Sequence, residues 1–290
     1  MYDETRGSET TKKRMISLSV QKVKGISSSH DQDLLAVEEP LEIRLGYYSQ
    51  GKRKNKTISI TMRTPGDDLE LAAGFLFTEG IIKSYDQVKN VRHRDLNNSN
   101  IQESNVVQLG LRQDIKADLN RLERHFYTTS SCGVCGKTSI EALQLIGCPA
   151  LTKDRPIINS ATIHRLHDAL KEAQTVFSQT GGLHAAALFN SEGELVCLRE
   201  DVGRHNAVDK LIGAQLVEKE LPLHDRLLMV SGRASFELVQ KALMAGLPIL
   251  AAVGAPSSLA VDLALNNDMT LLGFVRENRF NIYSGEWRIK

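Results

Sequence analysis

Apolar and polar residues alternate through the first third of the chain. A period of two is typical of half-buried strands, because successive side chains of a strand point to opposite faces of a sheet. The alternation is clearest at Ile16, Leu18 and Val20. Four further segments predict strands, namely 41–45, 58–62, 88–93 and 106–111.

One helix is predicted among these strands. The turn residues 64–67 precede an apolar stretch from Asp68 to about Phe77, and either Asp67 or Asp68 is a plausible N-cap. Residues 1–14 are polar and are predicted to form a disordered tail. Residues 15–125 are therefore predicted to form a small β-rich domain with one helix.

After Ala161 the apolar residues recur at helical spacing, and short apolar runs then alternate with helical patterns. The predicted strands are 183–189, 194–198, 226–230, 248–253, 270–275 and 280–283, and the predicted helices are 163–177, 207–217, 235–245 and 258–265. Strands that alternate with helices predict a sheet with parallel strands and with helices on both faces, because crossovers are right-handed. The predicted fold class is α/β (α+β for the whole chain), with a three-layer α/β/α sandwich over residues 139–290.

Composition narrows the class of protein. Of 290 residues, 41% are hydrophobic and 24% charged, as in soluble globular proteins. The net charge of +1 offers no basic surplus, so no binding to nucleic acid is expected. The first 24 residues lack a signal-peptide core, and glycines and prolines interrupt the longest uncharged stretch, 242–261, so no membrane association is expected. Four cysteines exclude a disulfide-built scaffold, and the predicted location is cytoplasmic.

The pair Cys132 and Cys135 is the sharpest local signal. It lies in a stretch of small polar residues, which predicts an exposed, mobile loop over residues 126–138. Thr138 and Glu141 have the spacing of a capping box, so a helix is expected to begin near Thr138. The N-terminus of that helix, together with the neighbouring Lys137, favours a thiolate over a thiol.

Three other interpretations of the cysteine pair are half a zinc site, a structural disulfide and a redox dithiol. Zinc commonly takes four ligands from two close pairs. The other two cysteines stand alone, since Cys148 precedes a proline and Cys197 lies in a predicted strand, so zinc is disfavoured. Both are expected to be core residues.

Three predicted strand-to-helix joints carry glycine and polar residues, namely 200–206, 231–235 and 254–258. In a parallel sheet they would share the carboxyl edge, where open α/β sheets bind ligands. Helix N-termini with Arg204, His205, Arg233 and Ser257 would suit a phosphate-bearing ligand. The alternative is that these are ordinary turn and cap residues.

His184 invites comparison with zinc-dependent nucleobase deaminases, which use an H-x-E motif followed by P-C-x-x-C. Ala186 occupies the glutamate position, and the cysteine pair lies upstream of the histidine. Deaminase catalysis is therefore not expected, although a related fold stays open. His184 is either a structural histidine or one that faces a ligand.

Taken together, several segments resemble the formate dehydrogenase accessory sulfurtransferase family, FdhD. The segments that carry the resemblance are 37–43, 64–68, 79–80, 131–136, 180–184, 200–206, 231–233 and 273–283. The resemblance covers nearly the whole chain, and the combination is far more specific than the cysteine pair alone.

The resemblance implies a cytoplasmic sulfur carrier, commonly homodimeric, with a cytidine-deaminase-like C-terminal domain. Such a sulfurtransferase accepts sulfur from a cysteine desulfurase as a persulfide and passes it to the molybdenum bis(molybdopterin guanine dinucleotide) cofactor. Formate dehydrogenase needs this cofactor in its sulfurated form. GDP is then the natural analogue of the nucleotide part of the cofactor.

Residue by residue, the resemblance assigns the persulfide to Cys132, with Cys135 as its partner. It assigns cofactor binding to the stretch Phe274, Val275, Arg276, Glu277, Asn278 and Arg279. From the residues alone this stretch is a solvated turn between strands, with two arginines available to a pyrophosphate. Two alternatives stay open, namely a non-catalytic cofactor-binding chaperone with redox-sensitive cysteines and a zinc-binding module.

Overall fold

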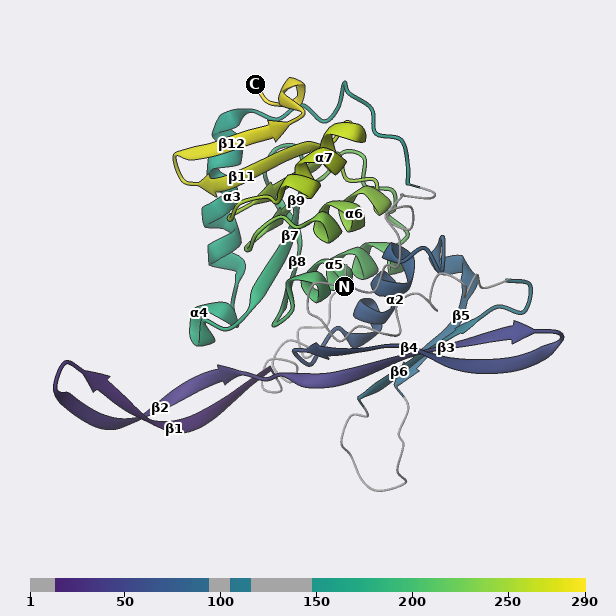
Figure 1. Cartoon of the computed structure of the whole chain (residues 1–290), viewed down its shortest axis with the longest axis horizontal. Helices are drawn as coiled ribbons and strands as arrows, with labels where there is room; N and C mark the ends of the chain where they lie inside the picture. Colours follow the sequence, from purple (N-terminus) through teal and green to yellow (C-terminus); the bar gives the residue numbers. More distant parts are fainter. Residues whose placement is uncertain (1–13, 94–104, 116–147) are drawn as a thin grey trace.

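The computed structural model describes residues 14–93, 105–115 and 148–290, which form three sheets and the helices around them (Figure 1). The tail 1–13, the polar loop 94–104 and the segment 116–147 lie outside the described residues. The predicted cysteine loop, the capping box and both of its cysteines fall in that last segment. No helix within the described ranges is long and apolar enough to cross a membrane.

The largest sheet has six strands in the order β12-β11-β10-β9-β7-β8. Their bounds are His184–Phe189 (β7), Leu195–Asp201 (β8), Leu227–Val230 (β9), Ile249–Ala252 (β10), Thr270–Arg276 (β11) and Arg279–Ser284 (β12). Strands β9, β10 and β11 are parallel, and β8 runs in the same direction. β7 and β12 run antiparallel to them, so the predicted sheet exists but is mixed.

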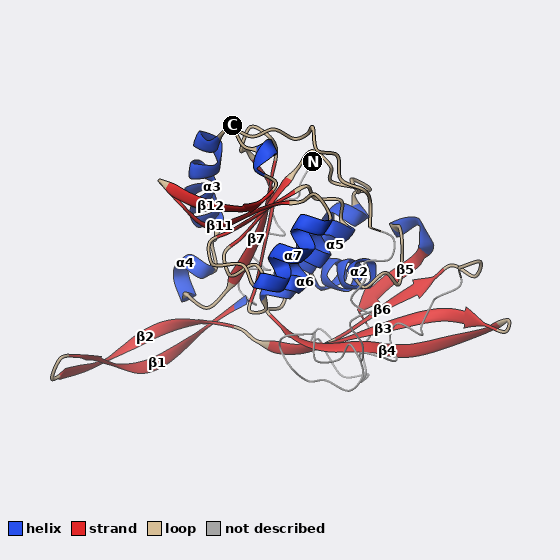
Figure 2. Cartoon of the chain, turned by 45° about the horizontal axis from the view of Figure 1, so that its top comes forward, coloured by secondary structure: helices blue, strands red, loops and turns tan. Residues whose placement is uncertain are grey.

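Helices cover both faces of this sheet, as the alternation of strands and helices predicts (Figure 2). The helices are Ser160–Ala173 (α3), Phe177–Thr180 (α4), Arg204–Val217 (α5), Phe236–Met244 (α6) and Ser258–Asn266 (α7). In β7, Ala187 and Phe189 point toward α3, while Ala186 and Leu188 point toward the core shared with α5 and α6. The period of two within each strand therefore builds a three-layer α/β/α sandwich.

A second sheet, in the order β4-β3-β6-β5, lies below the sandwich in Figure 1. Its strands and the helix that packs on it are Glu39–Ser49 (β3), Lys52–Arg63 (β4), Asp68–Thr78 (α2), Val88–His93 (β5) and Val106–Leu111 (β6). α2 lies between this sheet and α5, and residues from β3 to β11 contribute to one hydrophobic core. The two halves of the chain are thus joined by buried apolar side chains.

A two-stranded hairpin extends away from both sheets (Figures 1 and 2). It consists of Met15–Lys24 (β1) and Ser27–Ala36 (β2), which pair antiparallel along their full length. The alternation at Ile16, Leu18 and Val20 predicts β1. Most of β2 is polar, so no strand was predicted there, and it forms by pairing with β1.

Candidate functional site

The carboxyl ends of β8, β9 and β10 lie at one edge of the sandwich, because these three strands run in the same direction. The three joints that follow them therefore share this edge, as predicted. β7 runs the opposite way, so its first residue, His184, enters the sheet at the same edge. The three joints and the start of β7 thus meet at one edge, although they lie up to about seventy residues apart in the sequence.

A pocket of about 380 Å³ opens among these joints. Its volume lies within the range of small-molecule sites, ~300–1,000 Å³. The lining residues are Arg204, Arg233, Ala234, Ser235, Phe236, Glu237, Ala255, Pro256, Ser257 and Leu259. The pocket therefore combines two guanidinium groups, the first turns of α6 and α7, and several apolar side chains.

The cap residues of the two helices differ in what their side chains do. Ser257 Oγ accepts a hydrogen bond of 3.3 Å from the amide of Ala260 and so caps α7. Ser235 holds the N-cap position of α6 without a side-chain cap bond, and its Oγ lies 3.3 Å from His205 Nε2. Ser235 thus contacts the start of α5 instead of capping its own helix.

Charged groups converge on the pocket from α5, from α6 and from the joint that carries Arg233. His205 Nε2 lies 2.8 Å from Glu237 Oε2, which joins the start of α5 to the start of α6. Within the described part of the chain, the buried Nε of Arg204 has no hydrogen-bond partner. Arg204 and Arg233 together make the pocket suitable for an anion.

Glycines allow the joints to approach one another. A Cβ at Gly254 would lie 2.9 Å from Cγ of Arg233, and a Cβ at Gly232 would lie 3.4 Å from Nδ1 of His184. His184 is half-buried against Gly232. Burial lowers the pKa of His184, and the neighbouring Arg204 and His205 lower it further, while Asp201 opposes them. A neutral imidazole is therefore favoured at this edge.

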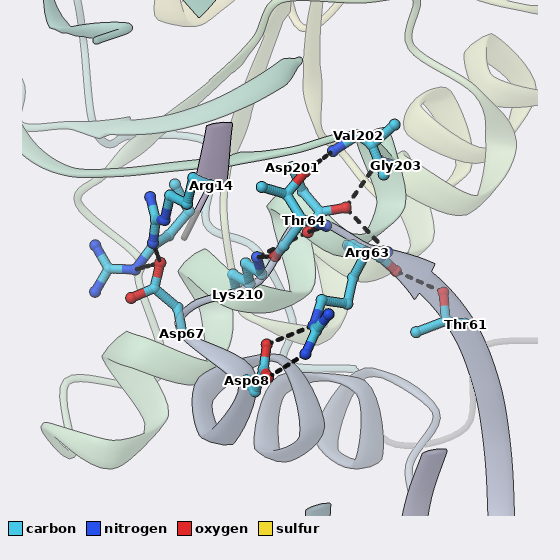
Figure 3. A network of polar contacts seen from close by, with 12 residues as sticks. Arg14, Thr61, Arg63, Thr64, Asp67, Asp68, Asp201, Val202, Gly203 and Lys210 are labelled. Atoms are coloured by element: carbon cyan, nitrogen blue, oxygen red, sulfur yellow. Dashed lines mark hydrogen bonds and ion pairs between the residues drawn. The ribbon is translucent and has the colours of Figure 1, made fainter. Parts of the chain in front are cut away.

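Two acidic residues of the first joint do not face the pocket. Glu200 accepts hydrogen bonds from the backbone amides of Val176 and Phe177, at 3.0 and 2.9 Å, and so holds the start of α4. Asp201 Oδ2 lies 2.7 Å from Lys210 Nζ, and both side chains are fully buried (Figure 3). These two carboxylates are structural.

The buried pair of Asp201 and Lys210 connects the sandwich to the segment before α2 (Figure 3). Lys210 Nζ donates to the carbonyl of Thr64 at 2.8 Å, and the amide of Thr64 donates to Asp201 Oδ2 at 3.2 Å. Asp201 Oδ1 also accepts from the amide of Gly203 and from Asn206 Nδ2. The segments 64–68 and 200–206 of the predicted family motifs thus meet in one polar network.

The predicted N-cap position of α2 is confirmed, but the side-chain cap bond is missing. Asp67 holds the N-cap position, but its side chain makes no cap bond and instead pairs with Arg14. Asp68 accepts two hydrogen bonds from Arg63, at 2.9 and 2.8 Å (Figure 3). Burial would raise the pKa of Asp67, but the positive charges of Arg14, Arg199 and Lys210 outweigh it and lower this pKa.

The stretch from Phe274 to Arg279 adjoins the pocket without lining it. The amide of Phe274 donates to the carbonyl of Gly254 at 3.1 Å, and the side chain is 38% exposed. Arg276 Nη1 donates to the carbonyls of Val253 and Val275 at 2.8 and 2.9 Å, so part of its guanidinium is already engaged.

The other members of the stretch differ in burial. The side chain of Val275 is buried in the core beneath α3. Glu277 and Asn278 form the turn between β11 and β12, and Arg279 is exposed at the start of β12. Phe274 has a φ of 54°, which is rare for a bulky residue and marks a locally strained backbone.

Cys132 and Cys135 lie outside the described residues, so their geometry is not part of this site. The two described cysteines are half-buried against the core. Burial raises the pKa of both Cys148 and Cys197 to about 11. Because the thiolate is the nucleophile in sulfur chemistry, this raised pKa argues against either as the reactive cysteine.

These features define an α/β protein with a pocket at the carboxyl edge of its sheet whose lining suits an anion. Residues 36–290 match the model of the FdhD/NarQ family. The chain belongs to this family.

Curated relatives cover most of the chain, and each is named sulfur carrier protein FdhD. The relative from Streptomyces avermitilis is 51% identical over 261 residues, or 89% of each chain. That from Mycobacterium tuberculosis is 46% identical over 261 residues, covering 89% of this chain and 92% of the relative. That from Sulfurisphaera tokodaii is 42% identical over 272 residues, covering 94% and 98%. Family membership supports a role in carrying sulfur.

A solved structure shares the fold. It is the crystal structure of a protein described as a formate dehydrogenase accessory protein from Desulfotalea psychrophila, with a TM-score of 0.74. The similarity covers 96% of this chain and 100% of that one. At 23% identity this comparison bears on the fold alone.

Proposed function

We propose that this protein is a cytoplasmic sulfurtransferase that carries sulfur as a cysteine persulfide. It accepts the sulfur from a cysteine desulfurase and delivers it to the molybdenum bis(molybdopterin guanine dinucleotide) cofactor of a formate dehydrogenase. The cofactor is the substrate that receives the sulfur, and the protein acts as a homodimer.

The observation that carries this proposal is the pocket between the three joints. It offers Arg204 and Arg233, the first turns of α6 and α7, and an apolar wall that includes Phe236. Guanidinium groups and helix N-termini are suited to a pyrophosphate, and the apolar wall suits a flat ring. A nucleotide-bearing substrate fits this combination better than an inorganic anion does.

Sulfur transfer begins as thiol–persulfide exchange at Cys132. The thiolate attacks the terminal sulfur of the donor persulfide, a new S–S bond forms on Cys132, and the donor cysteine leaves as its thiolate. Cys135 then attacks Sγ of Cys132, releases the terminal sulfur as hydrosulfide to the substrate and leaves a disulfide between the two. An external dithiol reduces that disulfide for the next cycle.

Calorimetric titration with GDP tests the pocket. We expect GDP to bind, and Arg233→Ala to weaken binding by ~10- to 150-fold, because one charge-assisted hydrogen bond contributes about 1.5–3 kcal/mol. Arg226→Ala is the matched control, since Arg226 precedes β9 at the opposite edge of the sheet. No heat with GDP, or equal loss in both variants, would remove the pocket from the proposal.

Two alternatives are separated by simple measurements. A cofactor-binding chaperone with redox-sensitive cysteines would bind GDP but gain no sulfur mass after incubation with a desulfurase and cysteine. A zinc-binding module would retain close to one zinc per chain after purification under reducing conditions.

A further inference from the structure

One residue in the pocket has the wrong charge for a site that only binds phosphate. Glu237 contributes a carboxylate to the lining, close to Arg204 and Arg233. Its side chain is only 12% exposed. A carboxylate so placed repels a phosphate and needs its own partner from the ligand or from the protein.

The protein holds this carboxylate in place from a second helix. His205, on α5, contacts Glu237 Oε2 at 2.8 Å and Ser235 Oγ at 3.3 Å. Glu237 itself lies in the first turn of α6, where the helix dipole favours a negative charge. The carboxylate is therefore held in position at the wall of the pocket.

A carboxylate has about four lone-pair positions on its two oxygens, so the contact with His205 leaves acceptor capacity toward the pocket. Acceptors of this geometry match two neighbouring N–H donors, as in carboxylate–arginine pairs. The 2-amino-4-oxopyrimidine edge presents such a pair, namely a ring N–H beside an exocyclic amine. Guanine and pterin rings share this edge, whereas adenine has an unprotonated ring nitrogen there and hypoxanthine lacks the amine.

We infer that Glu237 is the specificity-determining residue of the pocket and binds the 2-amino-4-oxopyrimidine edge of a guanine or pterin ring. The flat faces of such a ring fit the apolar lining made by Phe236, Pro256 and Leu259, while the two arginines bind the phosphates. This inference rests on the proposed function, because it assigns the base of the ligand in the same pocket.

The test is a set of titrations of the full chain with GDP, IDP and ADP. We expect GDP to bind ~5- to 150-fold more tightly than IDP, since one good bidentate contact gives that discrimination. ADP should bind more weakly still. Glu237→Gln should bring the affinities for GDP and ADP within about threefold, because the amide offers a donor where the amine of guanine needs an acceptor.

Glu192→Gln is the matched control and should keep the preference for GDP, because Glu192 lies in the exposed turn between β7 and β8 at the opposite edge. Titration with a phosphate-free pterin distinguishes the two sources of the ring. Pterin binding that Glu237→Gln abolishes indicates the pterin, and selectivity for GDP without pterin binding indicates guanine.

The outcomes separate this inference from the proposed function. If wild-type protein binds GDP, IDP and ADP equally, or if Glu237→Gln keeps the wild-type preference, the inference is overturned while a phosphate-binding pocket stands. If neither nucleotides nor pterin bind, the pocket assignment under the proposed function also fails. The comparison of GDP with IDP uses wild-type protein alone, so equal affinities would overturn the inference even if the variant folds poorly.

Discussion

Gly74 of α2 and Gly213 of α5 face each other where the two helices cross. A Cβ on Gly74 would lie 1.9 Å from the carbonyl oxygen of Asp209, and one on Gly213 would lie 1.9 Å from that of Glu70. The backbones of the two helices are therefore in direct contact. This crossing joins the N-terminal sheet to the sandwich and so orients the network around Asp201.

Gly213→Ala should destabilise the protein strongly, although alanine favours an isolated helix by about 1 kcal/mol. The added methyl group meets backbone that cannot rotate away, so the helices must separate. We expect a loss of at least about 3 kcal/mol in the free energy of unfolding, measured with urea. Leu265→Ala, at an exposed position of α7, should change it by less than ~0.5 kcal/mol. A variant as stable as the wild type would contradict the close crossing.

Lys210→Met should cost about 3–5 kcal/mol of stability, because it leaves the buried carboxylate of Asp201 without its counter-charge. Lys219→Met is the matched control. Lys219 pairs with Asp86 at 2.7 Å, but their side chains are 66% and 68% exposed, so the expected loss is ~0–1 kcal/mol. Equal losses in the two variants, measured by urea unfolding, would show that burial does not determine how much the pair of Lys210 and Asp201 contributes to stability.

His184 should make stability depend on pH near neutrality. In the unfolded chain a histidine titrates at about pH 6.5. In the folded chain, burial, Arg204 and His205 lower the pKa of His184, so below about pH 6.5 the unfolded chain binds more protons. The contribution of His184 is therefore fully present above about pH 6.5 and is lost as the pH falls through the lowered value.

The measurement for His184 is the urea-unfolding free energy of wild type and His184→Gln between about pH 8 and pH 5. The wild type should lose more stability on acidification than the variant does. The same slope in both proteins would exclude His184 as the source of the dependence.

Cys132→Ser should abolish the persulfide adduct formed after incubation with a desulfurase and cysteine, and leave formate dehydrogenase folded but inactive. Cys135→Ser should be milder, because the adduct on Cys132 still forms and the external dithiol can release its sulfur, more slowly, in place of Cys135. Intact-protein mass spectrometry detects the added sulfur. Cys197→Ser is the control and should keep the adduct, since burial raises the pKa of that thiol to about 11. An adduct on Cys132→Ser but none on Cys135→Ser would reverse the two roles.

Local pattern was sufficient for most elements. The alternation along β1 and the helical spacing of α3 depend on residues two to four positions apart, so each segment predicts its own element. The common edge of the three joints also followed, because strand direction is constrained by right-handed crossovers. The polar strand β2 has no such pattern, and its conformation comes from pairing Leu35 with Ile16 along the hairpin.

The candidate site was predictable only in part. Arg204, His205, Arg233 and Ser257 stood out because they follow predicted strands together with glycine. Glu237 gave no signal of this kind, since an acidic residue in the first turn of a helix is ordinary. Its role as a pocket residue depends on contact with His205, thirty-two positions earlier in the chain.

The sequence by itself determined the layers of the sandwich, the segments that resemble the family, and the cysteine pair. Each of these features depends on residues that are close together in the sequence. Only the tertiary structure decided that Lys210 lies opposite Asp201 and that Gly74 lies opposite Gly213. In the sequence, Lys210 is one of several polar residues of its helix, and each glycine lowers the helix propensity of its segment. The structural roles of Lys210, Gly74 and Gly213 depend on partners that are distant in the sequence. Local pattern does not predict these partners, because burial and close packing depend on the whole fold.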